Sequence, residues 1–214
     1  MILKVSDVAK ASSGHEKFKV AFADGTQLTV TAAQIADFGL FSGREIPDDE
    51  FAELVGALEE SAARSSALRI LGSRNMSSGR VRRKLLEKGT NEPAADKAVK
   101  WLEDVGAIND AEHACAIVRH YSSKGYGEAR IKDELFRRGI DRELWDEAMA
   151  CGEGADAAAL EYLRKRLRGS ADAGELKRAA DALCRRGFGY SEARALTSRY
   201  IEELEAPDGA EPGD

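Results

Sequence analysis

Apolar residues recur along residues 61–204 with the spacing of amphipathic helices, and three segments end on one shared pattern. Counting back from a glycine, apolar residues stand at minus eight, minus four and minus three, which places them on one helical face. The glycine stands where a left-handed residue ends a helix. The three patterns comprise Val81, Leu85, Leu86 and Gly89; Ile131, Leu135, Phe136 and Gly139; and Ala179, Leu183, Cys184 and Gly187.

The glycines are 50 and 48 positions apart, which is about one unit of a three-helix repeat array. Glycine, asparagine or aspartate stands at the breaks between apolar segments, where such residues end one helix and cap the next. We therefore predict three tandem three-helix repeats over about 61–108, 109–152 and 153–204. The nine predicted helices span residues 61–71, 77–88 and 93–105; 111–123, 127–138 and 141–150; and 155–168, 172–186 and 190–204.

Residues 1–58 have a different pattern, which predicts a small β-rich N-terminal extension. Residues 2–5 predict a short strand, and apolar residues alternate over 18–22 and 28–30 on either side of Asp24-Gly25, a two-residue hairpin signal. Because so small a sheet is marginal alone, we expect it to pack on a neighbour. The predicted fold class is mainly α, with the three repeats preceded by this β-rich lobe.

Two short helices are predicted after the hairpin. Thr31 is a suitable cap for a helix through Asp37, and Pro47 opens another helix whose first turn is acidic. At the other end of the chain, residues 205–214 contain proline, glycine and acidic residues, with almost no apolar side chain. We predict that they form an acidic disordered tail.

Charge divides the chain in the same way. Residues 1–60 hold 5 basic and 11 acidic residues, whereas residues 61–204 hold 27 and 23. A repeated basic face suits nucleic-acid phosphates or an acidic protein groove, although such runs are also typical of solvated helix faces. The basic residues gather on the middle helix of each repeat: Arg80, Arg82, Arg83, Lys84 and Lys88; Arg130, Lys132, Arg137 and Arg138; Lys177, Arg178, Arg185 and Arg186.

Catalytic and metal-binding motifs give little support to an enzyme. The chain has no phosphate loop, nucleophile elbow, HExxH or GxGxxG motif, so an enzyme is the weaker hypothesis. His113 and His120 share a helical face, but Cys115 points elsewhere, so a metal site would need ligands from other helices. We expect no cofactor and no metal.

The cysteine, hydropathy and aromatic patterns predict the state of the thiols, the location of the protein and the side chains that pack in its cores. Cys115, Cys151 and Cys184 are odd in number and widely spaced, so we expect reduced, partly buried thiols. No apolar run reaches the length of a membrane span and the N-terminus lacks a signal-peptide pattern, so we expect a cytoplasmic protein. Most of the helical aromatic residues fall on apolar faces and are predicted to pack in cores: Trp101, Tyr121, Phe136, Trp145, Tyr162 and Tyr200.

Three stretches of sequence carry a family resemblance through their order and spacing. They are ALRILGSRNMSSGRVRRKLLEKG ending at Gly89, WLEDVGAIND ending at Asp110, and RHYSSKGYGEARIKDELFRRGI ending at Ile140. In this order they resemble the RecX regulatory proteins of bacteria. The chain departs from the family pattern at Asn75-Met76, where a second basic residue is common, and at His113, where an aromatic residue often stands.

The resemblance implies a non-enzymatic regulator of the RecA recombinase that lies in the groove of the RecA filament on single-stranded DNA. Binding there would depress ATP hydrolysis, strand exchange and cleavage of the SOS repressor. We expect a monomer, and the role of the N-terminal extension, contact or cap, stays open. The alternative is a module that binds nucleic acid directly, without RecA. The candidate contact residues are Arg80, Arg83, Lys84, Arg130, Lys132, Arg137 and Arg138.

Overall fold

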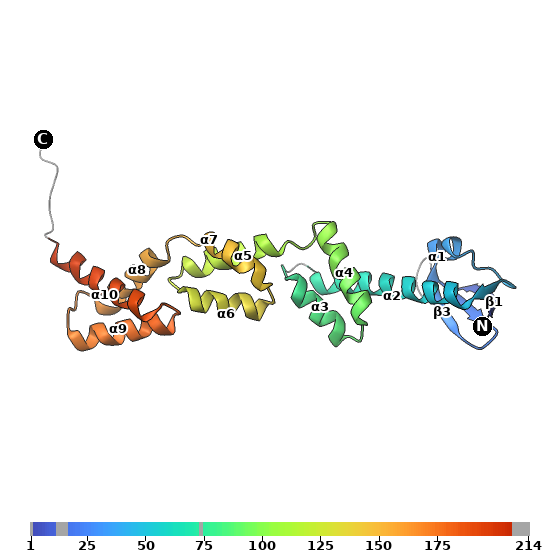
Figure 1. The fold of residues 1–214 in the computed structure, drawn as a ribbon, viewed down its shortest axis with the longest axis horizontal. Coiled ribbons are helices and arrows are strands. Elements are labelled where there is room, and N and C mark those ends of the chain that lie inside the picture. Colours follow the sequence, from blue (N-terminus) through green and yellow to red (C-terminus); the bar gives the residue numbers. More distant parts are fainter. Residues whose placement is uncertain (1, 12–16, 73–74, 207–214) are drawn as a thin grey trace, which may run out of the picture. The chain divides into compact units, whose positions relative to one another are not determined.

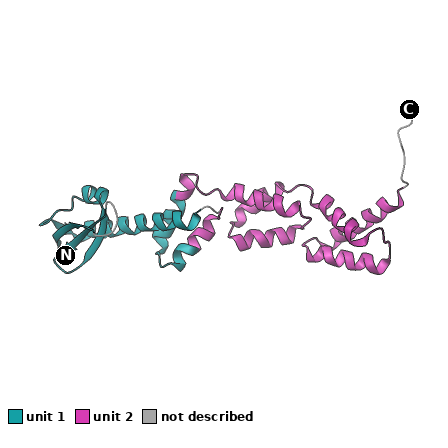
Figure 2. Ribbon diagram, turned by 180° about the vertical axis from the view of Figure 1, so that it is seen from behind, with its two compact units in different colours: residues 1–72, 84–101 teal, residues 73–83, 102–214 magenta. Residues whose placement is uncertain are grey.

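The structure is a computed structural model that describes residues 2–11, 17–72 and 75–206. It consists of a small antiparallel sheet followed by helices (Figure 1). The chain divides into two compact units, residues 1–72 with 84–101 and residues 73–83 with 102–214 (Figure 2). Most of the predicted acidic tail, residues 207–214, lies outside the described residues.

The N-terminal sheet contains β1 (Ile2–Lys10), β2 (Lys17–Phe22), β3 (Gln27–Thr31) and β4 (Glu45–Pro47) in the order β3-β2-β1-β4, with antiparallel neighbours. Alternate apolar residues of these strands are buried on one face, as the period of two predicts. The strand β4 was not predicted, because three residues are too few for a pattern. Its Ile46 nevertheless belongs to the buried cluster of the sheet.

The hairpin between β2 and β3 has a three-residue loop instead of the predicted two-residue loop. The amide of Phe22 donates to the Thr26 carbonyl at 2.9 Å, and Gly25, with φ at +92°, donates to the Phe22 carbonyl at 3.0 Å. After β3, Thr31 caps α1 (Ala32–Asp37) and exchanges side-chain hydrogen bonds with Gln34 in a capping box. That cap is where the sequence predicted it.

One continuous helix, α2 (Asp48–Leu71), runs through the boundary that the sequence predicted between residues 58 and 61. Its acidic first turn follows Pro47, and no residue between 48 and 71 requires a break. Leu54, early in the helix, belongs to the buried cluster of the sheet, and Phe51 packs edge-on against Phe22 at 5.2 Å. The sheet therefore has the helical neighbour that its small size requires.

The remaining helices fall within a few residues of the predicted spans. The protein is mainly helical, as predicted. In chain order these elements are α3 (Ser78–Glu87), α4 (Glu92–Asp104), α5 (Asp110–Ser122), α6 (Glu128–Arg138), the 3-10 turn η1 (Arg142–Leu144), α7 (Trp145–Ala150), α8 (Ala155–Leu167), α9 (Ala173–Arg185) and α10 (Tyr190–Glu205).

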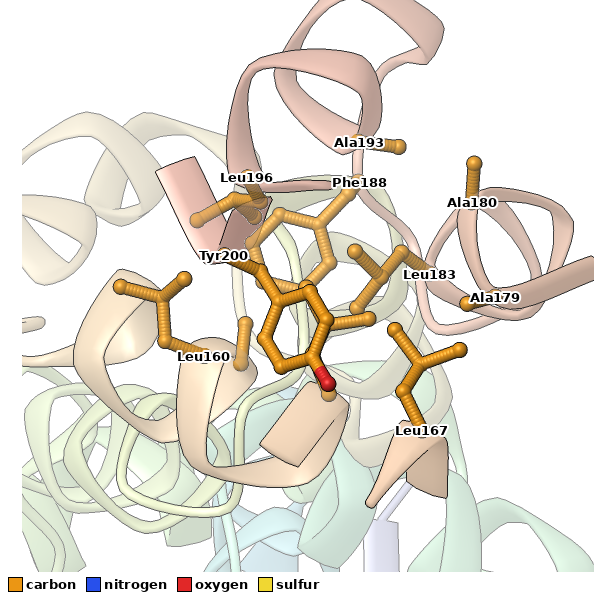
Figure 3. Packing of buried hydrophobic residues seen from close by; sticks show 11 residues of the cluster. Leu160, Leu167, Ala179, Ala180, Leu183, Phe188, Ala193, Leu196 and Tyr200 are labelled. Atoms are coloured by element: carbon orange, nitrogen blue, oxygen red, sulfur yellow. The ribbon is translucent and has the colours of Figure 1, made fainter. Parts of the chain in front are cut away.

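Two of the helix triplets have their own buried clusters. In α5–α7, Val118, Ile131 and Leu135 are buried together. In α8–α10, Leu183 and Tyr200 lie at the centre of a second cluster (Figure 3). The Tyr200 hydroxyl also accepts a hydrogen bond from the amide of Gly169 at 3.0 Å, which gives this buried polar atom a partner.

The shared pattern of the middle helices is confirmed at two of its three apolar positions. The residues at minus eight and minus four are buried in α3, α6 and α9. At minus three, Leu86 and Cys184 are half-buried, whereas Phe136 is 62% exposed. The prediction that Phe136 packs in a core is wrong, because one step along the helix turns a side chain by about 100°, to the edge of the apolar stripe.

The prediction of reduced thiols is wrong for two cysteines. Cys115 of α5 and Cys151, which follows α7, form a disulfide with 5.4 Å between their Cα atoms, and Cys184 is free. The pair is 36 residues apart in sequence. The packing of α7 on α5 brings the two together, and no spacing motif marks that contact.

Candidate interaction surface

The middle helices meet end to end through glycines. At the start of α6, the amide of Gly127 donates to the Arg186 carbonyl at 3.0 Å, and the amide of Ala129 donates to the Gly187 carbonyl at 3.1 Å. These bonds satisfy N–H groups that have no partner within α6. A Cβ atom on Gly127 would lie 2.4 Å from the backbone of Gly187, so the approach requires glycine.

The same arrangement joins α3 to α6. A Cβ atom on Gly79 would lie 2.6 Å from the Gly139 carbonyl oxygen, and the Ser77 hydroxyl donates to the Arg138 carbonyl. The start of α3 is held further by Asp110 of α5, whose carboxylate accepts from the Ser78 hydroxyl at 2.6 Å. These contacts fix the first turn of α3 against the last turn of α6.

Arg186, one of the predicted basic residues, links structural elements. Its guanidinium lies 4.8 Å from the centre of the Tyr126 ring and 4.1 Å from that of Tyr162. It also donates to the carbonyls of Lys124 and Gly125 at 2.8 and 3.0 Å. The charge is thereby used to brace the junction between α6 and α9.

Arg137 and Arg138 share one acidic partner. Glu134 is 8% exposed, and its carboxylate oxygens lie 2.7 Å from Nε of Arg138 and 3.3 Å from Nη1 of Arg137. Burial raises the pKa of Glu134, but the hydrogen bond from Arg138 and the two positive charges outweigh burial and hold that pKa below its ordinary value. One carboxylate beside two guanidiniums leaves a net positive charge at this end of α6.

Arg130 and Lys132 lie on different sides of α6. Two steps along a helix turn a side chain by about 200°, so the two cannot share a face. Lys132 pairs with Glu128 at 2.5 Å, and this hydrogen bond and charge raise the pKa of Lys132, whereas Arg130 lies 4.0 Å from Asp133. The structure therefore does not gather all seven candidate residues on one surface.

The candidates on α3 also divide. Arg80 and Arg83 are exposed, and neither forms an ion pair with the residues that the structure describes. Lys84 belongs to the other compact unit, where it lines a pocket of about 360 Å³ with Ser66 and Arg69 of α2. Of the seven predicted residues, Arg83 and Arg137 line a common cavity.

That cavity, here named the Phe136 cleft, has a volume of about 680 Å³ and lies between the start of α3 and the end of α6. Three of the side chains that define it were not predicted as site residues, because Phe136 was assigned to a core and Asp141 and Arg142 to no candidate group. The sequence did contain a sign that Phe136 is exposed, because two arginines follow it directly at the end of the helix. The side chains that define the cleft are Arg83, Phe136, Arg137, Asp141 and Arg142.

The histidines do not form a metal centre in the described part of the chain. His113 is half-buried, and its pKa is lowered by burial and by the charge of Arg138, against the opposing effect of Asp110. His120 is exposed and packs edge-on against Tyr121. Among the described residues, no three histidine, cysteine or acidic side chains gather to hold a metal ion, and no helix is both long and apolar enough to span a membrane.

The fold defines a tandem three-helix repeat protein, and the cleft between two of its middle helices is lined by three arginines. Residues 63–102 match the family domain described as the RecX first three-helix domain, and residues 109–149 match the RecX second three-helix domain. A regulatory protein RecX from Xanthomonas axonopodis pv. citri (strain 306) is 37% identical over 140 residues, which cover 64% of this chain and 86% of that protein. The chain belongs to the RecX family of regulatory proteins.

Further relatives agree with this assignment. Regulatory protein RecX of Stenotrophomonas maltophilia (strain R551-3) is 36% identical over 137 residues, covering 63% of this chain and 83% of that protein. A crystal structure of regulatory protein RecX covers 92% of this chain and 99% of its own, with a TM-score of 0.69 at 20% identity. The RecX structure from Lactobacillus salivarius covers 68% and 99%, with a TM-score of 0.58 at 21% identity. The solved structures share the fold of this chain.

Proposed function

We propose that this protein binds RecA, or its filament on single-stranded DNA, and inhibits the filament's ATPase, strand-exchange and coprotease activities during DNA repair and the SOS response. It acts as a cytoplasmic monomer without cofactor or catalysis. Membership of the RecX family supports this role. The observation that carries it is the Phe136 cleft, where Arg83 of one middle helix and Arg137 of the next line one cavity.

A regulator that blocks a filament needs a surface that spans more than one element and carries charge opposite to its target. The glycine junctions supply the first property, because they fix the end of α6 against the start of α3. The arginines supply the second, because a guanidinium pairs with carboxylate or phosphate through two parallel hydrogen bonds. Arg80 and Arg138 then serve as contacts beside the cleft, and Arg130 and Lys132, which lie on different sides of α6, serve as separate contacts outside it. Lys84 belongs to the other compact unit and is proposed as a contact of its own.

The test is the hydrolysis of ATP by RecA on single-stranded DNA, with this protein titrated to well below one molecule per RecA. We expect hydrolysis to fall at these substoichiometric amounts, as capping or disassembly of filaments requires. Arg83→Glu and Arg137→Glu should each weaken the inhibition. Lys165→Glu on α8 is the matched control, because it makes the same change in net charge at a side chain that is 76% exposed.

Inhibition by both cleft variants at the wild-type level, with the fold retained by circular dichroism, would remove the Phe136 cleft from the contact surface. An absence of any effect of the wild-type protein on RecA would refute the proposed function itself.

The second candidate function, direct nucleic-acid binding, is favoured by the three arginines beside one exposed ring. It predicts binding to DNA without RecA, with log affinity falling steeply as log salt rises.

A further inference from the structure

Phe136 presents an aromatic ring to solvent inside a positively charged cleft. Its side chain is 62% exposed, although the equivalent residues Leu86 and Cys184 are half-buried. An exposed phenylalanine ring forgoes the favourable hydrophobic free energy that it would gain by burial in a core. The ring is thus available for a ligand in the one repeat where the middle helix carries an aromatic residue at this position.

The charges around the ring are unbalanced. Arg83, Arg137 and Arg142 line the cleft, against one acidic residue, Asp141. The Asp141 carboxylate accepts a hydrogen bond from the Glu143 amide at 3.1 Å, so it caps the turn that follows. Arg137 shares the Glu134 carboxylate with Arg138. The cleft therefore carries positive charge that its own residues do not neutralise.

The positions of these groups are fixed by the fold. Gly139 ends α6 in the left-handed conformation, and Nη2 of Arg83 lies 3.2 Å from the position of a Cβ on Gly139. Trp145 donates its indole N–H to the Ile140 carbonyl at 3.1 Å, and the Arg142 guanidinium lies 5.6 Å from the centre of the Trp145 ring. Phe136 and Arg137 lie at the end of α6, Arg142 lies in the braced turn that follows, and Arg83 lies on α3 against that turn. Holding these groups in place lowers the cost of ordering them on binding.

We infer that the Phe136 cleft is a subsite for single-stranded nucleic acid, in which one base stacks on the Phe136 ring and the adjacent phosphates pair with the arginines. Stacking on an exposed aromatic residue within a basic groove is the usual chemistry of sequence-tolerant single-strand binding. The cleft volume of about 680 Å³ lies within the ordinary range of ligand pockets. The inference rests on the proposed function, since it assigns the DNA-contacting part of that surface.

An acidic peptide fits the cleft less well. A bound peptide helix needs several apolar anchors along a groove, and an added peptide strand needs a free sheet edge. Among the apolar side chains that line the cleft, Phe136 is exposed, whereas Ile140 is only 4% exposed. No strand contributes to the lining. One aromatic face surrounded by guanidiniums matches a nucleotide, which combines one flat base with one phosphate.

The experiment measures the fluorescence anisotropy of labelled oligothymidine with the full-length protein in the absence of RecA. Phe136→Ala should weaken binding about 5- to 150-fold, because base stacking contributes about that much per base. Phe136→Trp should retain binding and show quenching of its added fluorescence by the oligonucleotide. Phe41→Ala is the matched control, since Phe41 is also 62% exposed but lies in the N-terminal unit, and it should bind as the wild type does.

A salt titration tests the phosphate contacts separately. Replacing Arg137 with Gln should lower the slope of log affinity against log salt by about 0.7, the value for one phosphate contact on a single strand.

Equal affinity of Phe136→Ala and Phe41→Ala for the oligonucleotide, with both variants folded, would overturn the subsite. If Phe136→Ala then still loses inhibition of RecA, the cleft binds protein and the proposed function survives. If Phe136 is needed for DNA binding but the wild type leaves RecA unaffected, the subsite stands and the proposed function fails.

Discussion

Replacing Gly127 with alanine tests whether the end-to-end contact of the middle helices holds the repeats together. The backbone of Gly127 has φ at −83° and ψ at 170°, which alanine adopts without strain. The effect of the substitution therefore comes from the added methyl group, which would lie 2.4 Å from the carbonyl carbon and oxygen of Gly187. Both neighbours are backbone atoms, so α6 and α9 must separate.

The magnitude follows from what this separation disrupts. Two hydrogen bonds cross the junction, from Gly127 to the Arg186 carbonyl and from Ala129 to the Gly187 carbonyl. Each contributes about 0.5–1.5 kcal/mol, and forcing an extra carbon into a packed contact costs about 1–3 kcal/mol. Because the helices can relax, these costs partly overlap. We expect the free energy of unfolding to fall by about 2–4 kcal/mol.

Gly189→Ala is the matched control, because Gly189 occupies the same N-cap position of α10 with φ at −64° and ψ at 156°. A Cβ there would lie 3.3 Å from the flexible Glu192 carboxylate. Alanine is a poorer N-cap than glycine at both sites, so the control loses only that difference, about 0.5–1 kcal/mol.

Urea denaturation followed by far-UV circular dichroism measures both variants, and hydrogen exchange at the Ala129 amide reports the junction directly. Equal losses in the two variants, within about 0.5 kcal/mol, together with unchanged protection of Ala129, would refute the close-approach reasoning. A larger loss in Gly127→Ala with loss of that protection would support it.

Three further changes test other contacts of the fold. Arg186→Ala should lower stability by about 2–4 kcal/mol, because it removes two charge-assisted hydrogen bonds and two ring contacts, whereas exposed Arg185→Ala should change denaturation little. Under oxidising conditions, Cys115→Ser should lower the free energy of unfolding by about 3–4 kcal/mol, because the disulfide removes the entropy of closing a 36-residue loop in the unfolded chain. Under reducing conditions its effect should be no larger than that of Cys184→Ser. Free Cys115 in mass spectra of the oxidised protein would contradict this prediction. The pKa of Glu134 is lowered in the folded protein, so the stability that this carboxylate contributes is complete above its ordinary pKa of 4.5 and is lost as pH falls through the lower folded value. Glu134→Gln should flatten that part of a plot of unfolding free energy against pH. A plot that runs parallel to that of the wild type would refute this prediction.

Local pattern accounts for most of the secondary structure. The helix ends at Gly89, Gly139 and Gly187 were predicted from the residue type, and all three have positive φ. The helix cap at Thr31 was predicted in the same way, because a cap depends on residues within one turn, and the structure adds the reciprocal bond from Gln34. The merger of two predicted helices into α2 was missed, since a change in composition near residue 60 does not break a helix that packs along its length.

The candidate surface was predicted only in part. Arg83 and Arg137 were named from their charge and repeat position, and both line the Phe136 cleft. The same reasoning could not separate them from Arg138, which is not among the residues that line the cleft, or from Lys132 on another side of α6. Charge is visible in a sequence, but the partner that neutralises it comes from the packing.

The sequence by itself determined the helical periodicity and the glycine stops, because these depend on residues one to eight positions apart. It also determined the family resemblance, because this depends on the order and spacing of three stretches of the chain. Tertiary structure decided that Gly127 meets Gly187, that Cys115 meets Cys151, and that Phe136 stays exposed. Each of these results depends on how separate helices approach one another. Such contacts join residues tens of positions apart, so no local spacing encodes them, and only the packing of the repeats brings them together.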